Sequence, residues 1–313
     1  MAANAPLNRQ KSKSQSSYKQ ILNLSKAYYF NQGNSMAKSK NLKKEFPSVI
    51  DSAYKQYLRN LSLYKEVKEI MTKDVFTVTP EASMAEAAVT MGEKHIGSLI
   101  VTKYDTPVGI VTERDLLTKV LAPGKDMKKE KVETTMSYPL MAICLSAKIK
   151  EAARAMIKKK GRLAVFECGR LEGIVTASDL IKSLPDVPET EVKVDNLMTK
   201  LIVTADEHTS LKDIVKTMGD QRIGSVITTS KDKPIGIFTE RDLLTTCIAK
   251  GRSLSTEVGE EAKFPLITAP EGTSVHEAAA IMTMKHIRRL PIVKKDKLIG
   301  IITARDLVEA YAK

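Results

Sequence analysis

The chain lacks tryptophan, and aromatic residues make up only 5% of its 313 residues. No apolar run approaches the roughly 18 residues that a membrane-spanning helix needs, so we expect no integral contact with a membrane. The first residues also lack the basic end and sustained apolar stretch of a secretory signal. These absences argue against a membrane-embedded or secreted protein.

Cysteine and histidine are scarce as well. The three cysteines are widely spaced and odd in number, which excludes a full disulfide framework and indicates a reducing cytoplasm. None of the four histidines belongs to a His-x-x-x-His pair or lies near a cysteine at a metal-binding spacing. Serine-hydrolase and Walker phosphate-loop motifs are also missing. We therefore expect a cytoplasmic protein that is not an enzyme and binds no metal.

Acidic residues are absent before Glu45. Residues 1–66 contain 12 Lys and Arg residues but only three acidic residues, and they hold eight of the 15 aromatic residues. The rest of the chain is nearly balanced, with 38 basic and 34 acidic residues. We therefore divide the chain into a basic, tyrosine-rich arm (1–66) and a globular body. A basic segment with interleaved aromatics is typical of proteins that bind an acidic polymer.

The body contains a fourfold repeat. The segment GIVTERDLL at Gly109 returns as GIVTASDLI at Gly173, GIFTERDLL at Gly236 and GIITARDLV at Gly300, at spacings of 64, 63 and 64 residues. A helical segment precedes each copy, as in MAEAAVTM from Met84, although the second version is degenerate. Such regular spacing indicates a repeat architecture.

Each copy is predicted to run strand, helix, strand, strand, helix. Ser83 and Glu86 form a capping box at the start of the first helix. The segments SLIVTK and PVGIVT have the alternating residue pattern of a short strand pair. The second copy lacks a clear cap and the Met-Thr opening, which Thr134, Thr135 and Met136 restore in part. One copy of about 60 residues buries too little surface to be stable alone, so we expect pairs.

The predicted fold class is α/β (α+β), with four β-α-β-β-α repeats in two modules. The first module spans 67–185, with repeats at 67–122 and 132–185. The second spans 194–313, with repeats at 194–250 and 258–313. A linker rich in proline and acidic residues, SLPDVPETEVK from Ser183, separates them.

These motifs resemble the cystathionine-β-synthase (CBS) domain family, whose paired repeats form Bateman modules. The shared marks are MT-x-x-[VI] at Met71 and Met198 and G-h-h-T-x-x-D-L in all four copies, where h is apolar. The stretch KHIRRLPIVKKDKLIGIITARDL from Lys285 is similar to the γ subunit of AMP-activated protein kinase. The resemblance covers residues 67–313 and implies an adenine nucleotide ligand (AMP, ADP or ATP), or sometimes an S-adenosyl compound.

The Thr-x-x-Asp pairs are the first candidate nucleotide-binding residues. They are Thr112 and Asp115, Thr176 and Asp179, Thr239 and Asp242, and Thr303 and Asp306. A threonine N-cap with an aspartate at N3 could serve only to cap a helix. The same helix terminus also favours phosphate, and the carboxylate can accept hydrogen bonds from two ribose hydroxyls. The CBS resemblance implies that this aspartate holds ribose.

When the four copies are aligned on their glycines, a second position alternates between serine and arginine. The residue eleven positions before each repeat glycine is Ser98, Arg162, Ser225 or Arg289. A cleft shared by two copies would use one cation for phosphate and a small residue opposite it. Arg288 is a further phosphate candidate. The residue before the aspartate is basic in three copies, Arg114, Arg241 and Arg305, and could reach phosphate or form a solvent-facing salt bridge.

The arm has two parts. Residues 48–66 are predicted to form an amphipathic helix, which could pack on the first repeat. Residues 1–44 have a composition that predicts disorder when free, and their partner could be anionic lipid, DNA or RNA. Aromatic side chains can stack on unpaired bases, which structured RNA offers and duplex DNA does not. The candidate RNA-binding residues are Arg9, Lys11, Lys13, Lys19, Lys26, Tyr28, Tyr29, Phe30, Lys38, Lys40, Lys43 and Lys44.

The layout is similar to that of archaeal tandem-CBS proteins that act as ribosome hibernation factors. We therefore interpret the chain as a nonenzymatic protein that responds to an adenine nucleotide. Its arm would bind ribosomal RNA and ribosomal proteins and hold the ribosome inactive. The alternative is an energy-sensing regulatory subunit of an enzyme or transporter. A homodimer is compatible with either function, whereas a DNA-binding regulator is disfavoured because no helix-turn-helix is evident.

Overall fold

The computed structural model describes residues 65–159, 161–183 and 192–312, which belong to one compact unit spanning residues 57–313. The candidate RNA-binding residues and nearly all of the helix predicted at 48–66 lie outside the described residues. So does most of the predicted linker between the modules.

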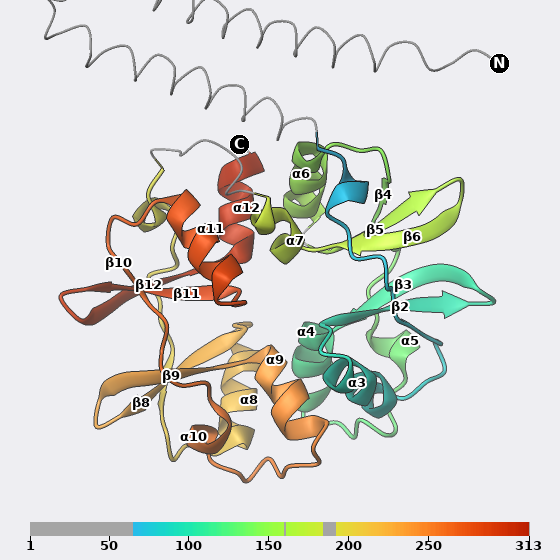
Figure 1. Ribbon diagram of the computed structural model, residues 1–313. Coiled ribbons are helices and arrows are strands. Elements are labelled where there is room, and N and C mark those ends of the chain that lie inside the picture. The colour runs from blue at the N-terminus through green and yellow to red at the C-terminus, as the bar shows by residue number, and fades with distance from the viewer. Residues whose placement is uncertain (1–64, 160, 184–191, 313) are drawn as a thin grey trace, which may run out of the picture. The chain divides into compact units, whose positions relative to one another are not determined.

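Each repeat carries one three-stranded sheet (Figure 1). The first repeat contains β1 (Thr77–Val78), α3 (Met84–Glu93), β2 (Ser98–Lys103), β3 (Thr106–Thr112) and α4 (Glu113–Leu116). The second contains α5 (Val132–Thr135), β4 (Ala142–Cys144), α6 (Ile149–Lys159), β5 (Leu163–Glu167), β6 (Arg170–Val175) and α7 (Ala177–Lys182). The third contains β7 (Thr204–Asp206), α8 (Leu211–Asp220), β8 (Ser225–Ser230), β9 (Lys233–Thr239) and α9 (Glu240–Asp242). The fourth contains α10 (Val258–Glu261), β10 (Ala269–Pro270), α11 (Val275–Met284), β11 (Arg289–Lys294), β12 (Lys297–Thr303) and α12 (Ala304–Ala312).

Short turns of other helix types complete these elements. Three-residue 3-10 helices, Val67–Glu69 and Val194–Asn196, open the two modules. After α4 and α9, the chain continues as π-helical turns at Leu117–Leu121 and Leu243–Ile248.

The predicted order of strands and helices is confirmed in all four repeats. In the first repeat, β1 pairs with β2 in parallel across α3, and β2 pairs with β3 in the antiparallel sense. The parallel pair requires a crossover helix, which explains why one long helix follows the first strand. The predicted capping box is present, because the Ser83 amide donates to Glu86 Oε2 at 2.7 Å and the Glu86 amide donates to Ser83 Oγ at 3.2 Å.

The two repeats of a module exchange their leading segments. Thr72, in the leading segment of the first repeat, bridges to Ile174 in β6 of the second repeat. Ser137, in the leading segment of the second repeat, bridges to Ile110 in β3 of the first. Met136 and Ser137 therefore take the place of the Met-Thr opening in the second copy. Each sheet gains an edge partner from the other repeat, which confirms the predicted pairing into Bateman modules.

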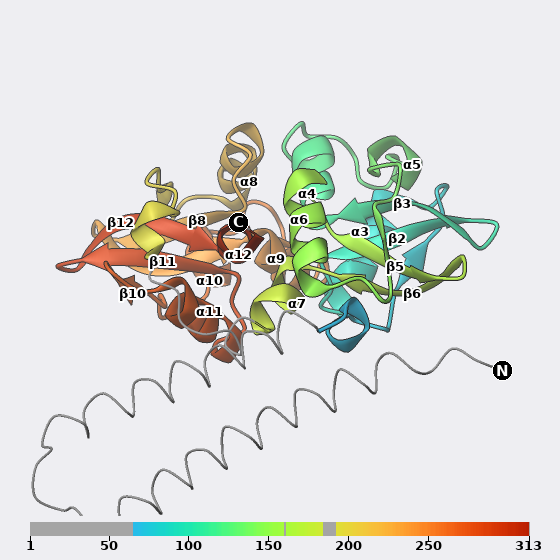
Figure 2. The ribbon, with the colours of Figure 1, turned by 90° about the horizontal axis from the view of Figure 1, so that it is seen from above.

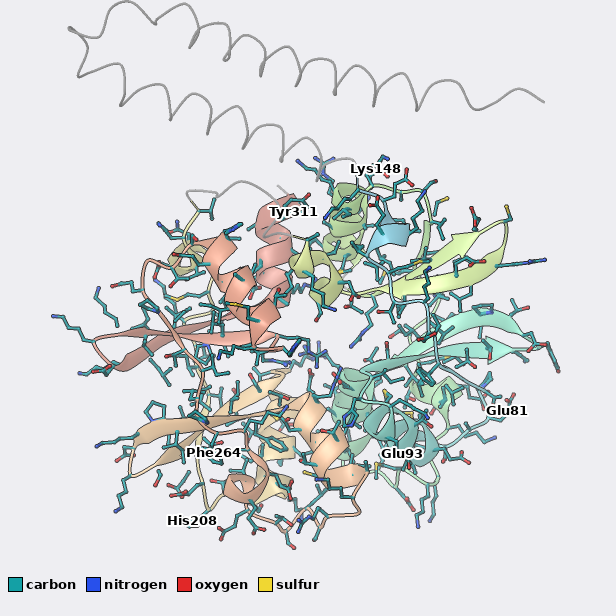
Figure 3. All side chains as sticks on the ribbon, viewed as in Figure 1. Glu81, Glu93, Lys148, His208, Phe264 and Tyr311 are labelled. Carbon is teal, nitrogen blue, oxygen red and sulfur yellow. The ribbon has the colours of Figure 1, made fainter. Side chains whose placement is uncertain are left out.

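The second module repeats this exchange. Thr199 bridges to Ile301 in β12, and Lys263 bridges to Ile237 in β9. In Figure 3, Phe264 lies beside the third repeat, although its segment opens the fourth.

The modules contact each other repeat to repeat. Leu244 of the third repeat joins the core of the first, and Leu117 of the first joins the core of the third. The second and fourth repeats share one core, in which Leu180 and Leu307 are buried. The helices of the two modules face each other, and the sheets lie on the outer sides (Figures 1 and 2). No helix in the described part of the chain is both long and apolar enough to cross a bilayer.

Candidate functional site

Each of the four Thr-x-x-Asp pairs caps the helix that follows it. The backbone N and Oγ1 of Thr112 donate to Oδ2 of Asp115 at 3.0 and 2.6 Å. The pairs that begin at Thr176, Thr239 and Thr303 repeat this arrangement at 2.6 to 2.9 Å. Capping therefore engages one carboxylate oxygen, Oδ2, in every copy. The second oxygen, Oδ1, distinguishes the copies.

In the first module, lysines of the same helical segment approach Oδ1. Lys119 Nζ lies 2.7 Å from Asp115 Oδ1, and it also donates to the carbonyl oxygen of Thr135 at 2.5 Å. Lys182 Nζ lies 3.6 Å from Asp179 Oδ1, and the Lys182 side chain is 60% exposed. An exposed lysine can turn away at little cost, because surface ion pairs contribute only about 0–1 kcal/mol.

The second module is asymmetric. Asp242 is fully buried, and Lys263, from the exchanged segment of the fourth repeat, places its Nζ 2.9 Å from Asp242 Oδ1. This approach is not a well-aligned hydrogen bond, since Asp242 Oδ1 accepts none from the described residues. Asp306 has no cation within 4.0 Å in the described ranges. The ribose-binding candidate is therefore covered by a lysine in the third repeat and uncovered in the fourth.

Two cavities open beside the first module, where it meets the second, and each is lined by one of the two aspartates of the first module. The cavity of about 340 Å³ is bounded by residues that include Val75, Ser98, Ile100, Thr176 and Asp179. The cavity of about 570 Å³ is bounded by residues that include Thr112, Asp115, Tyr138, Thr303 and Arg305. Arg162 and Arg288 line both cavities. The volumes lie in the range of small-molecule sites.

A cluster of charged side chains fills the junction of the repeats beside these cavities. It consists of five arginines, Arg114, Arg162, Arg241, Arg288 and Arg289, and two glutamates, Glu113 and Glu240. We call it the central cluster; nitrogen-bearing side chains gather there in Figure 3. The glutamate side chains are only 3% and 8% exposed. The guanidinium groups leave three positive charges in excess, which favours an anionic ligand.

Each glutamate of the central cluster binds two arginines. Glu113 accepts hydrogen bonds from Arg241 Nε and, at 3.2 Å, from Arg288 Nη2. Glu240 accepts from Arg114 Nε and Arg289 Nη2, both at 2.9 Å. Charge-assisted bonds of this kind are about twice as strong as neutral ones.

Two glycines allow the backbone to approach the cluster. A Cβ on Gly97 would lie 2.8 Å from both Arg162 Nη2 and Glu113 Oε1. A Cβ on Gly224 would lie 2.8 Å from Glu240 Oε2. Any side chain at either position would displace a charged group, so the glycines are part of the site.

The charges of the central cluster shift its ionisation equilibria. Burial alone would raise the pKa of Glu113, but the guanidinium groups of Arg288, Arg241 and Arg162 outweigh it and lower the pKa to about 2. Burial lowers the pKa of Arg162 and of Arg289. Arg162 forms no ion pair or hydrogen bond with any other described residue. It is therefore a cation that a ligand could engage without breaking an existing bond.

The structure brings most of the predicted site residues together. Those that line one or both cavities are Thr112, Asp115, Arg162, Thr176, Asp179, Arg288, Arg289, Thr303 and Arg305. Thr239, Asp242 and Asp306 line neither cavity. Arg114 also lines the larger cavity and Arg241 the smaller one. Both form salt bridges, as one of the two sequence interpretations held, and these bridges join the modules.

Sequence reasoning missed Glu113 and Glu240. A glutamate in the first turn of a helix is ordinarily an exposed residue that complements the helix dipole. The signal was an alternation, because the residue after the capping threonine is Glu113, Ala177, Glu240 or Ala304. This is the same odd and even pattern as that of the serine and arginine column.

The described residues contain no group of three or more His, Cys, Asp or Glu side chains that could hold a metal ion.

Comparison with known proteins identifies the family. The CBS domain profile matches residues 67–122, 131–186, 194–248 and 258–313. The uncharacterized protein MJ1404 of Methanocaldococcus jannaschii is 30% identical over 272 residues, which cover 80% of this chain but only 63% of that protein.

Two solved structures share the fold. The crystal structure of MJ1225 from M. jannaschii, proposed as an archaeal homologue of γ-AMPK, matches with a TM-score of 0.66 and 24% identity. The match covers 79% of this chain and 100% of that chain. A conserved protein from Pyrococcus horikoshii matches with a TM-score of 0.55 and 22% identity over 79% of this chain and 99% of its own. The family profile covers most of the chain, and the chain therefore belongs to the CBS-domain family.

Proposed function

We propose that the body is a regulatory unit that binds an adenine nucleotide (AMP, ADP or ATP) and catalyses no reaction itself. The observation that carries this proposal is the cavity of about 340 Å³, which is lined both by a helix-capping aspartate, Asp179, and by Arg162, a cation with no ion pair among the described residues. Asp179 Oδ1 would accept the ribose hydroxyls, and Arg162 and Arg288 would bind phosphate. Val75, which is half-buried, offers an apolar surface for the base.

The second cavity of the first module offers a similar set of groups. Asp115 takes the place of Asp179, and the exposed ring of Tyr138 could stack on the base. We also retain the fourth repeat as a binding site, because Asp306 Oδ1 has no cation partner among the described residues and Arg289 begins β11 of the same repeat. Arg289 donates a hydrogen bond to Glu240, so it would have to break this bond before it could bind phosphate.

Titration calorimetry with AMP, ADP and ATP tests the proposal. Arg162→Ala and Asp179→Ala should each weaken binding by about 10–150-fold, the equivalent of about 1.5–3 kcal/mol for a charge-assisted contact. Glu133→Gln, a surface substitution in α5, is the matched control and should bind as the wild type does. Unchanged affinity in both test variants, with the fold intact, would return these residues to purely structural roles.

The partner of this unit is a separate proposal, which rests on residues 1–44. We propose that the arm binds RNA and docks the protein on the ribosome as an inhibitory or hibernation factor. Nine basic residues, no acidic residue and the cluster Tyr28, Tyr29 and Phe30 favour single-stranded or looped RNA over lipid or DNA. The alternative is an energy-sensing regulatory subunit, with which the proposed kinship of MJ1225 to γ-AMPK agrees. Co-sedimentation from cell extract with ribosomal particles or with one enzyme would discriminate between them.

A further inference from the structure

The bond between Arg288 and Glu113 connects the two modules. Glu113 begins α4 of the first repeat, whereas Arg288 immediately precedes β11 of the fourth. Arg288 Nη2 donates to Glu113 Oε2 at 3.2 Å, and the second bond to Glu113, from Arg241, also comes from the second module. Both anchors of this buried carboxylate therefore belong to the opposite module.

The same arginine lines both cavities of the first module. Arg288 is 31% exposed, so its guanidinium group is accessible to a ligand, whereas the Glu113 side chain is 3% exposed. A guanidinium group offers five donors in a fixed plane. Nη2 is the donor that Arg288 gives to Glu113, so a bidentate phosphate that takes Nη2 as one of its two donors competes with Glu113 and would break this long bond.

Glu113 has a second anchor, which lets the exchange occur without leaving its charge unpaired. When Arg288 turns toward a ligand, the bond from Arg241 Nε remains. Arg162 lines the same cavities and can take another phosphate oxygen. The even-numbered copies carry Ala177 and Ala304 where the odd copies carry Glu113 and Glu240, so helix capping does not require this carboxylate.

We propose that Glu113 is an internal counter-anion that competes with ligand phosphate for Arg288, so that a phosphorylated ligand in the first module weakens the contact between the modules. Glu113 is then a residue that sets the affinity for the phosphate part of the ligand and leaves the nucleoside part unaffected. The inference rests on the proposed nucleotide-binding function and adds its regulation.

The test compares adenosine, AMP and ATP on the full chain and on Glu113→Gln. The variant keeps the shape of the side chain and one of its two acceptor oxygens, but removes its charge. We expect AMP and ATP to bind about tenfold more tightly to the variant, with adenosine unchanged. Equal affinity of the variant and the wild type for AMP and ATP would overturn the proposal, as would an equal gain for adenosine. Glu133→Gln is the control for a charge lost elsewhere.

A second variant keeps the proposal testable if Glu113→Gln does not fold. Arg288→Met should reduce the preference for AMP over adenosine by about tenfold, while binding of adenosine is retained. An undiminished preference would overturn the proposal.

Hydrogen exchange measures the coupling between the modules. In the wild type, ATP should speed backbone amide exchange in α3 and the π-helical turn Leu243–Ile248, which contact each other across the modules, and adenosine should not. Slower or unchanged exchange with ATP would overturn the coupling.

Failure of the underlying function has a different signature. If neither adenosine nor any nucleotide binds the wild type, both proposals fail. If nucleotide binding depends on Arg162 and Asp179 but responds neither to Glu113→Gln nor to Arg288→Met, the inference about Glu113 fails and the proposed function stands without Arg288 as a phosphate ligand.

Discussion

Arg289 Nη2 lies 2.9 Å from Glu240 Oε2, and both side chains are largely buried, with 14% and 8% of their surfaces exposed. Arg289 was singled out by the sequence for phosphate, yet in the structure it neutralises a carboxylate of the neighbouring repeat. The arginines of the central cluster thus have two roles: they hold the junction of the repeats together, and they provide positive charge to the cavities.

The first role predicts a loss of stability. Arg289→Ala leaves the buried Glu240 with Arg114 alone, and breaking a buried pair in this way costs about 3–5 kcal/mol. We expect the free energy of unfolding, measured by urea denaturation, to fall by about that amount. Arg305→Ala is the control, because Arg305 forms no ion pair within the described ranges and its loss should change stability by about 0.5 kcal/mol or less. Equal stability of the two variants would contradict the structural role of Arg289.

The acid stability of the protein should depend on Glu113. Its pKa falls from an ordinary value of 4.5 to about 2 on folding, so its ionised form stabilises the folded state above about pH 4.5. That contribution is lost as the pH falls toward 2. The difference in unfolding free energy between the wild type and Glu113→Gln should therefore narrow by roughly 2 kcal/mol between about pH 6 and about pH 3. Urea denaturation at the two pH values measures it, and a constant difference would show that Glu113 is not held ionised by the cluster.

Lys263 should limit binding in the third repeat. It occupies the position that Ser137 holds in the first module, since both residues bridge to the last strand of the preceding repeat. Lys263→Ser removes the ammonium beside Asp242 Oδ1, so nucleotide binding by the second module should strengthen by about tenfold or gain a site. The reciprocal Ser137→Lys would place an ammonium near Asp115 and weaken binding in the first module. Titration calorimetry measures the stoichiometry and affinity of nucleotide binding by both variants. If neither variant differs from the wild type, Lys263 does not limit binding in the third repeat.

The arm should account for the salt dependence of ribosome association. Deleting residues 1–44 removes nine basic residues, so fewer counterions are released on binding. We expect the truncated protein to sediment with ribosomes much less than the full chain does, and this residual sedimentation to be nearly independent of salt. Nucleotide binding by the body should be unchanged. If the truncated protein pellets as well as the full chain, or if neither pellets at low salt, the RNA-binding proposal fails and the regulatory-subunit alternative takes its place.

Local signals were sufficient to predict the architecture. The capping box at Ser83, the alternation from Ser98 and the spacing of the repeat glycines each lie within one repeat, so no long-range contact had to be inferred. The paired copies could be recognised because the differences between copies one and two recur in copies three and four.

The central cluster could not be predicted in the same way. Glu113 and Arg241 are 128 residues apart, and their contact depends on how the modules dock. No local pattern encodes that docking, and in a single helix the sequence Thr-Glu-Arg-Asp describes an ordinary first turn. The exchange between Thr72 and Ile174 was missed for the same reason, although it explains why copies occur in pairs.

The exchange of leading segments also constrains how the chain can fold while it is being synthesised. The outer edge of β3 lacks its cross-repeat partner until Ser137 has been translated, although β1 to β3 are complete by Thr112. An exposed strand edge of this kind is a template for association with other chains. We therefore expect nascent chains arrested between the two repeats to aggregate, and the smallest independently folding fragment to be a whole module.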